Sequence, residues 1–399
     1  MRMRKATSVL LGLLLAGVAA TPAHAASIRA QQWHLDSMKA DEMWKVSTGK
    51  GVTIAVIDSG VGRVPELEGQ VLPGKNFAPN AKGDERVDHS NHGTGIAAMI
   101  AGTGKHPSGD GAFGIAPGVK ILPLRVKGEV GSKEPTWTEA IRYAADSDAK
   151  VINISLATTN ATQTDDPDRA AAVKYALSKG KLVFAAVGNS GDTTNEVEYP
   201  GATVGVVGVG AIDRQGNATA ESQKGAQVDL AAPGVDIVTA CTSKTGVCKT
   251  HGTSDASALA SASAALIWAA HPDWTNNQVL RVMLNTAGKP RDGVERNNHI
   301  GYGVVRPRIA LSNPGDPGPA DKWPLPDLAA AASPAPGSSG SGEAAAPSAG
   351  ASAAPSPAAQ AADKDDDGGS SLPWIALGIG AAVLIGGAVT AVAVRARNR

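Results

Sequence analysis

Four polar side chains of the 399-residue sequence combine the groups that nucleophilic catalysis requires. Asp58, His92 and Ser254 offer a carboxylate, an imidazole and a hydroxyl, and Asn189 offers a side-chain amide. A serine hydroxyl becomes an effective nucleophile when an imidazole removes its proton, and a carboxylate holds that imidazole in the correct tautomer. The amide of Asn189, with the backbone N–H of Ser254, would stabilise negative charge on a carbonyl oxygen. The four residue types therefore predict acyl transfer through a covalent intermediate.

Asp58 and Asn189 each follow a segment that we predict to be a buried strand. Asp58 ends the apolar run 52–57, and Asn189 follows the run 182–187 after Gly188. Short apolar runs bounded by turn residues are typical of strands buried on both faces of a sheet. The two candidates would thus stand at the carboxyl ends of strands, where open parallel sheets place their active sites. Two further runs of this kind occur at 151–156 and 204–209.

His92 and Ser254 stand at predicted helix starts. His92 opens a run of small residues, and Ser254 precedes the alanine-rich stretch 256–270, where it would meet the positive end of a helix dipole. Alternation of strands and helices predicts a three-layer α/β domain, with a mostly parallel sheet covered by helices on both faces. Capping signals mark other helix starts, at Thr136 with Glu139, Asp166 with Pro167, and Thr275 with Gln278.

The segments around the four residues resemble the motifs of the subtilisin-like serine proteases. Four such motifs in the order Asp, His, Asn, Ser are far more specific than any one of them. The resemblance extends over nearly all of residues 31–311, and it implies an α/β serine endopeptidase that acts on polypeptides without a cofactor. The motifs are Ala55-Val56-Ile57-Asp58-Ser59-Gly60-Val61, His92-Gly93-Thr94-Gly95, Ala186-Val187-Gly188-Asn189 and Gly252-Thr253-Ser254.

The resemblance also implies a substrate-binding segment. Ser155, Leu156 and Ala157 would pair with the substrate as an extended strand, and Gly188 would belong to the same site. We therefore expect these four residues to lie beside the nucleophile.

Three residues depart from the usual family pattern. Ala157 replaces a glycine, Ala258 replaces a proline four residues after Ser254, and Asp255 replaces an apolar residue beside it. An acid next to the nucleophile would raise the pKa of the catalytic histidine or alter the substrate preference.

A metal site is the competing interpretation of the region around His92. His89 and His92 have an H-x-x-H spacing, and acidic residues stand at 84, 85 and 88. Two imidazoles without a third placed ligand are weak support for zinc. We therefore predict no metal, with His92 as the base and His89 as a loop residue.

Both ends of the sequence have the features of targeting segments. Residues 1–25 combine basic residues, an apolar run and the small-x-small site Ala23-His24-Ala25, which is typical of a cleaved signal peptide. Residues 372–394 contain the apolar run Trp374–Val394, which is long enough to cross a bilayer. Arginines within 395–399 predict a cytoplasmic tail. The region between the two segments would be extracellular.

Between these ends we predict a head domain at 26–311, with an N-terminal extension at 26–50, and a linker at 312–371. The linker is rich in Ala, Pro, Gly and Ser, a composition that disfavours a packed core. The layout is similar to that of the mycosins, the membrane-anchored subtilases associated with type VII secretion in actinobacteria. This similarity implies a membrane secretion complex as a partner. It leaves open a second function, in which the domain stabilises that complex and proteolysis is secondary.

Charge and cysteine content limit the remaining possibilities. Without the two targeting segments, acidic residues outnumber basic ones by six, which argues against a nucleic-acid-binding surface. Cys241 and Cys248 are the only two cysteines. An extracellular location favours a disulfide between them. The alternatives are two free thiols or pairing with another chain.

Overall fold

The computed structural model describes residues 26–78, 81–126, 137–158 and 166–332. The predicted signal peptide 1–25, transmembrane segment 372–394 and tail 395–399 lie outside these residues, as does the linker from 333 onward. No helix within the described ranges has the length and apolar character needed to cross a membrane.

The elements of the described chain alternate as the sequence predicts. The strands are β1 (Thr53–Asp58), β2 (Lys75–Asn76), β3 (Lys120–Arg125), β4 (Val151–Ile154), β5 (Leu182–Ala186), β6 (Val207–Ile212), β7 (Leu230–Pro233), β8 (Ile237–Ala240) and β9 (Val247–Thr250). The α-helices are α1 (Ile28–Gln31), α2 (Trp33–Met38), α3 (Ala40–Met43), α4 (His92–Ala101), α5 (Trp137–Asp146), α6 (Pro167–Ser178), α7 (Thr253–Ala270), α8 (Asn276–Thr286), α9 (Pro307–Ser312) and α10 (Asp327–Ala332), with a 3₁₀ helix at Pro65–Leu67.

Seven strands form a parallel sheet in the order β2-β3-β1-β4-β5-β6-β7. The chain leaves β1 for β3 on one side and later returns to β4 on the other side of β1. The strand order therefore reverses at β1. In open α/β sheets, ligands bind at such a switch point, beyond the carboxyl ends of the strands.

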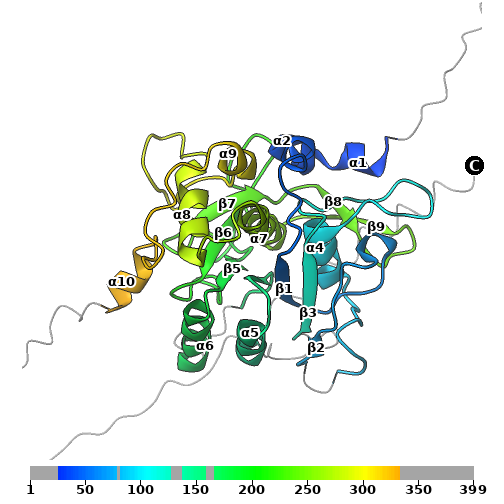
Figure 1. Cartoon of the computed structure of the whole chain (residues 1–399), viewed down its shortest axis with the longest axis horizontal. Coiled ribbons are helices and arrows are strands. Elements are labelled where there is room, and N and C mark those ends of the chain that lie inside the picture. Colours follow the sequence, from blue (N-terminus) through cyan, green and yellow to red (C-terminus); the bar gives the residue numbers. More distant parts are fainter. Residues whose placement is uncertain (1–25, 79–80, 127–136, 159–165, 333–399) are drawn as a thin grey trace, which may run out of the picture. The chain divides into compact units, whose positions relative to one another are not determined.

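Helices cover both faces of this sheet (Figure 1). Alternate residues of β1 point to opposite faces, so that Ile54 and Val56 pack with α4 and α7, whereas Ala55 and Ile57 pack with α5 and α6. The fold is a three-layer α/β arrangement with a parallel sheet, as the sequence predicts.

Helix α7 runs through the middle of the helical layer and is buried from Thr253 to Trp268. It contacts β4, β5, β6 and β7 on the sheet, and α4, α8 and α9 beside it. Its inner positions carry mostly alanine and serine, which lets the helix lie close to all of these neighbours. The amino end of this helix carries Ser254.

Five of the nine strands in the described residues, β2, β3, β7, β8 and β9, lie outside the four predicted runs. Strand β3 contains Pro123, which interrupts its apolar sequence. The backbone N–H of Ile121 donates to the Gln70 carbonyl oxygen on the side of β3 away from β1. Pro123 lies two residues later and faces the same side, so its missing N–H interrupts no hydrogen bond to β1. Strand β6 begins at Val207, three residues after the predicted start, because Val204 lies in an exposed turn.

Two of the predicted helix starts are confirmed. Asp166 accepts hydrogen bonds from the backbone N–H groups of Asp168 and Arg169 at the start of α6. Thr275 and Gln278 form a complete capping box at the start of α8. The third signal involves Thr136, which lies outside the described residues.

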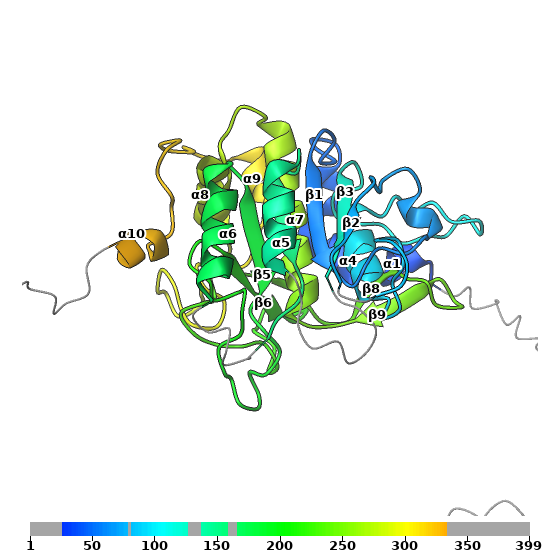
Figure 2. The same cartoon turned by 90° about the horizontal axis from the view of Figure 1, so that it is seen from below.

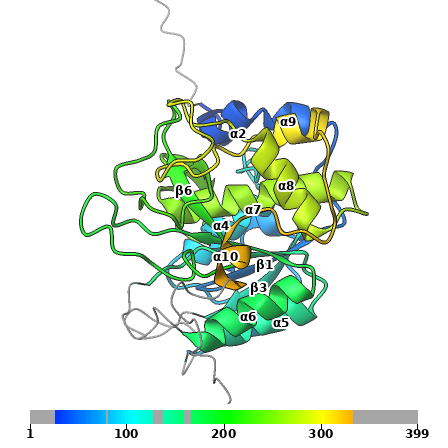
Figure 3. The ribbon, with the colours of Figure 1, turned by 90° about the vertical axis from the view of Figure 1, so that its left-hand side faces the viewer.

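The N-terminal extension packs on the domain. The Gln32 side chain is fully buried and donates to the carbonyl oxygens of Phe113 and Val238 at 2.7 and 3.0 Å. Trp44 Nε1 donates to the Ile115 carbonyl at 2.9 Å, and Leu35 and Met43 belong to the hydrophobic core. In addition, α3 contacts α9, so the beginning and the end of the domain meet at the end of the molecule that Figure 3 shows at the top.

Residues 313–332, which belong to the predicted linker, lie against the head domain. Arg281 Nη1 donates to the carbonyl oxygens of Pro317 and Pro319 at 2.7 and 2.9 Å. Asp327 then accepts a 2.6 Å hydrogen bond from the backbone N–H of Gly205. Composition alone predicts a free chain here, but these specific contacts hold the segment in place. Its last helix, α10, lies at the opposite end of the molecule from the hairpin β8–β9 (Figure 2).

The hairpin β8–β9 is antiparallel and leads directly into α7. Cys241, which follows β8, forms a disulfide with Cys248 of β9, as the sequence predicts. The bond closes the hairpin just before the loop that carries Ser254.

Candidate active site

Asp58 and His92 form a close pair at the carboxyl end of β1 and the start of α4. His92 Nδ1 lies 2.7 Å from Asp58 Oδ1, which also accepts the backbone N–H of Ser59 at 2.7 Å. Asp58 is fully buried, whereas the His92 side chain is 37% exposed. A carboxylate at Nδ1 fixes the tautomer in which Nε2 accepts a proton.

Short-range contacts hold His92 at this position. Asp88 accepts hydrogen bonds from Ser59 Oγ and from the backbone N–H of Thr94, each at 2.9 Å. Ser59 Oγ in turn accepts the N–H of Gly93 at 3.0 Å. Glycine is needed at 93, because a Cβ there would lie 2.2 Å from the Gly60 carbonyl oxygen. Asp88 thus organises the helix start, and the described residues contain no group of three or more acidic, histidine or cysteine side chains that could hold a metal ion.

The charge around His92 favours its protonated form. Partial removal of the ring from water lowers the pKa of His92, but the Asp58 carboxylate, with Asp255 and Asp88, raises it overall to about 9. Asp255 is itself buried beside Ser254, and burial raises its pKa to about 6 although Thr250 Oγ1 donates to its carboxylate at 2.7 Å. The unusual acid next to the nucleophile therefore acts on the electrostatics of the histidine.

Ser254 lies on the first turn of α7 with its hydroxyl at the edge of the cavity. Ser254 Oγ donates to the carbonyl oxygen of Ser155 at 2.8 Å, and Ser155 Oγ donates to the Ser254 carbonyl at 2.9 Å. The reciprocal bonds join the start of α7 to the end of β4. In this rotamer the hydroxyl is bonded to Ser155, and no hydrogen bond links it to His92 Nε2.

A buried polar cluster continues from Ser155 into the core. Asn153 is fully buried, and its Nδ2 donates to Ser155 Oγ at 2.9 Å. Its Oδ1 accepts hydrogen bonds from Ser257 and Ser261 of α7 at 2.9 and 3.0 Å. Since all of these polar groups are hydrogen-bonded, the cluster fixes the position of α7 along its axis relative to β4.

Asn189 is oriented by its neighbour on α7. Its Oδ1 accepts hydrogen bonds from the backbone N–H and from the hydroxyl of Thr253, both at 2.9 Å. These contacts turn Nδ2 away from Thr253, and no described residue accepts a hydrogen bond from it. Thr253 also accepts the N–H of Gly188 at 3.2 Å. The sequence motif contained Thr253 but did not reveal this orienting role.

A cavity of about 540 Å³ brings these residues together. It contains every predicted catalytic and substrate-binding residue except Asp58, which lies behind His92. Sequence reasoning missed one charged member, Glu198, because no motif surrounds it. The lining residues are Ser59, Ser90, His92, Ser155, Leu156, Ala157, Ala186, Gly188, Asn189, Ser190, Glu198, Thr253 and Ser254.

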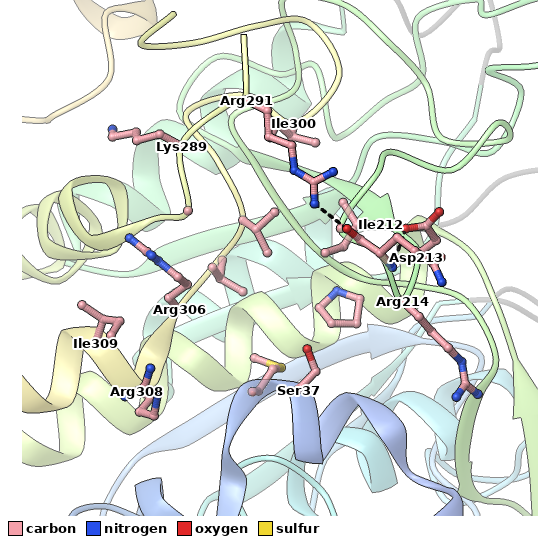
Figure 4. A pocket seen from close by; sticks show the side chains of 17 residues that line it. Ser37, Ile212, Asp213, Arg214, Lys289, Arg291, Ile300, Arg306, Arg308 and Ile309 are labelled. Atoms are coloured by element: carbon pink, nitrogen blue, oxygen red, sulfur yellow. Dashed lines mark hydrogen bonds between the residues drawn. The ribbon is translucent and has the colours of Figure 1, made fainter. Parts of the chain in front are cut away.

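The described part of the chain also contains a second cavity, of about 380 Å³, between α2, α9 and the loops after β6 and α8. Its wall is strongly basic, yet the charged ends of Lys289, Arg291 and Arg214 point in different directions (Figure 4). Arg291 donates to the Gln215 carbonyl at 2.6 Å, and the other basic residues of the wall are Arg306 and Arg308.

Comparison with known proteins identifies relatives of this arrangement. The profile of the subtilase family matches residues 49–303. An intracellular serine protease of Paenibacillus polymyxa is 34% identical over 211 residues, which are 51% of this chain and 63% of that protein. The chain therefore spans less than two thirds of the length of this relative.

Solved structures give a closer match in length. MycP1 from Mycobacterium smegmatis superposes with a TM-score of 0.65 at 28% identity, over 76% of this chain and 89% of that one. A chain of an intact ESX-5 inner membrane complex superposes with a TM-score of 0.63 at 27% identity, over 77% and 83% of the two chains.

Proposed function

This chain belongs to the subtilase family, and we propose that it is a membrane-anchored serine endopeptidase of the mycosin type. The observation that carries the proposal is the pairing of His92 with Asp58 in a cavity that also contains Ser254 and Asn189. The polypeptide substrate is the expected one for this family, and a single C-terminal membrane helix at 372–394 is the proposed anchor.

In the proposed reaction, Ser254 Oγ turns from the Ser155 carbonyl toward His92 Nε2 and attacks the carbonyl carbon of the scissile bond. The proton of Oγ passes to His92, and Asp58 stabilises the resulting imidazolium. Nδ2 of Asn189 and the N–H of Ser254 bind the oxyanion. His92 then gives its proton to the leaving amine, and water hydrolyses the acyl-enzyme by the reverse transfers.

Labelling by a fluorophosphonate probe tests this proposal. We expect the full-length chain in its native membrane to be labelled at Ser254, as identified by peptide mass mapping, and Ser254→Ala to remain unlabelled. Ser263→Ala is a matched control, because Ser263 lies on the same helix and bonds only to the Leu259 carbonyl. Labelling that persists in Ser254→Ala, or that is absent from the folded wild type, contradicts the assignment.

A second function is favoured by the similarity to a chain of the ESX-5 inner membrane complex. Related MycP1 and MycP3 structures come from type VII secretion systems. We propose that this chain also stabilises a secretion complex in the membrane, independently of proteolysis. A membrane anchor keeps the head domain at high local concentration around a neighbouring partner.

Comparison of a full deletion with Ser254→Ala in the native cell separates the two functions. If Ser254→Ala preserves a membrane complex that the deletion destroys, both functions hold. If the complex dissociates in both strains to the same extent, proteolysis accounts for the whole effect and the stabilising role is wrong. Blue native electrophoresis of the membranes and the amount of secreted protein provide the two measurements.

A further inference from the structure

We propose that Glu198 makes this site selective for peptides with a positively charged side chain, lysine or arginine, on the acyl side of the scissile bond (the P1 residue). This inference rests on the proposed endopeptidase function and specifies its substrate class. It begins from the observation that the cavity of Ser254 contains one carboxylate that the proposed reaction does not use.

The Glu198 carboxylate packs directly on the backbone beside the oxyanion residue. A Cβ at Gly188 would lie 2.5 Å from Glu198 Cδ and 2.7 Å from its Oε2. Gly188 also has φ +113, so two constraints require glycine there. The carboxylate therefore lies next to the residue that precedes Asn189, within the cavity that holds the reacting groups.

The carboxylate is held through one oxygen and open through the other. Glu198 Oε1 accepts hydrogen bonds from Ser190 Oγ at 3.0 Å and from Gln223 Nε2 at 2.8 Å. Gln223 is fully buried and provides a fixed donor. Glu198 Oε2 has no donor among the described residues. A ligand that enters the cavity therefore meets an oriented oxygen with an unused acceptor position.

The loop that carries Glu198 is tied to the predicted substrate-binding segment. Thr158 and Tyr199 exchange both backbone hydrogen bonds, at 2.9 and 3.0 Å. This pair fixes the residue after Glu198 to the residue after Ala157. The carboxylate and the segment Ser155–Ala157 therefore line the same cavity from two paired segments of the chain.

The chemistry of the cavity fits a long side chain with a cationic end. Burial raises the pKa of Glu198, although the hydrogen bonds from Ser190 and Gln223 lower it, and no described cation pairs with the carboxylate. A lysine or arginine of the substrate would supply the missing countercharge. Its methylene groups would pack against the apolar walls formed by Leu156, Ala157 and Ala186.

Hydrolysis of matched peptides by the full-length chain tests the inference. The peptides differ only at P1, which is lysine, arginine, norleucine or glutamate. We expect kcat/KM for lysine or arginine to exceed that for norleucine by about 10- to 100-fold, as for a charged hydrogen bond in a partly buried site. Glu198→Gln should bring kcat/KM for the lysine and arginine peptides to the same level as that for the norleucine peptide. Glu196→Gln is the matched control, because Glu196 is exposed and its side chain lies outside the cavity.

Two further measurements keep the inference testable if Glu198→Gln does not fold. The wild-type preference for lysine should decline as the pH falls and Glu198 takes up a proton. The Ser254→Ala variant leaves peptides uncleaved, so calorimetry gives their dissociation constants, and lysine should bind about 10- to 100-fold more tightly than norleucine.

The outcomes test the selectivity of Glu198 and the endopeptidase function separately. Equal kcat/KM and equal dissociation constants for lysine and norleucine overturn the role of Glu198, even if Ser254 is labelled by fluorophosphonate. A preference that persists in Glu198→Gln overturns it as well. Failure of labelling in the folded wild type contradicts the endopeptidase function instead, and the binding measurements on Ser254→Ala still judge the selectivity.

Discussion

Two of the cavities in the head domain, the catalytic cavity and the second cavity beside α9, differ in what their polar side chains contact. In the second cavity, Arg306 donates to the carbonyl oxygens of Thr286 and Ala287 at 2.9 and 3.0 Å, which completes the carboxyl end of α8. In the catalytic cavity, Asn189 Nδ2 and Glu198 Oε2 have no partner within the described structure. Basic side chains gather in the second cavity. The catalytic cavity instead contains oriented polar atoms that are open to a ligand. Oriented polar atoms beside a hydroxyl and an imidazole, rather than a high density of charge, distinguish the catalytic cavity from the second one.

The largest expected effect is the loss of peptide hydrolysis in Ser254→Ala, by roughly 10⁴- to 10⁶-fold in kcat. The reason is that the other hydroxyl on the first turn of α7, that of Thr253, donates to Asn189 Oδ1 at 2.9 Å and is not free to replace the nucleophile. Arg291→Ala in the second cavity should leave kcat within about twofold of wild type, because Arg291 bonds only to the loop of Gln215 and Asn217. Steady-state kinetics of both purified variants provide the test. A comparable loss in Arg291→Ala would remove the distinction between the cavities.

Asn189→Ala should lower kcat by about 100- to 1,000-fold with a smaller change in KM, because its Nδ2 serves the transition state more than the bound substrate. Asn217→Ala is the matched control, because Asn217 accepts a hydrogen bond from Arg291 of the second cavity, and it should leave both constants unaltered. The measurement is the dependence of initial rate on peptide concentration. If the change at Asn189 is confined to KM, then Asn189 binds substrate and the oxyanion assignment is wrong.

The pH profile should reveal the acidic surroundings of His92. The histidine must be neutral to accept a proton, and with its pKa raised to about 9, kcat/KM at pH 7 should be about 100-fold below its alkaline plateau. Asp255→Asn removes a negative charge that raises the pKa of His92, so the midpoint should move to lower pH.

Asp213→Asn provides the control for this prediction, since it removes an acid from the second cavity. Its profile should coincide with that of the wild type. A midpoint near pH 6.5 in the wild type, or one that Asp255→Asn does not move, would show that the carboxylates around His92 do not control its protonation.

The smallest expected effect concerns Arg306→Ala, which should lower the free energy of unfolding by about 1 kcal/mol because two carbonyl groups lose their donor. Turnover should stay unchanged. Urea denaturation followed by tryptophan fluorescence measures the first quantity, and peptide hydrolysis measures the second. Stability equal to that of the wild type, with reduced turnover, would assign the second cavity a functional role.

Local sequence signals predicted those parts of the site that depend on strand ends and helix starts. Asp58 and His92 stand where a strand ends and a small-residue helix begins, so spacing alone places them. Glu198 could not be found in this way, because its position depends on the pairing of Thr158 with Tyr199, two residues that are 41 positions apart in the sequence. The same holds for residues 313–332, whose composition predicts a tether although Arg281 fixes them to α8.

The close packing of helix α7 limits which amino-acid substitutions this protein can accept during evolution. Because Ala256, Ala260 and Ala264 are fully inaccessible and packed between the sheet and other helices, a larger side chain at any of them has no free volume to enter. Each such substitution would move the helix that carries the nucleophile. In a saturation mutagenesis screen for growth or activity, we therefore expect this helix to tolerate the fewest replacements, while new substrate preferences arise from surface loops such as the one that contains Glu198.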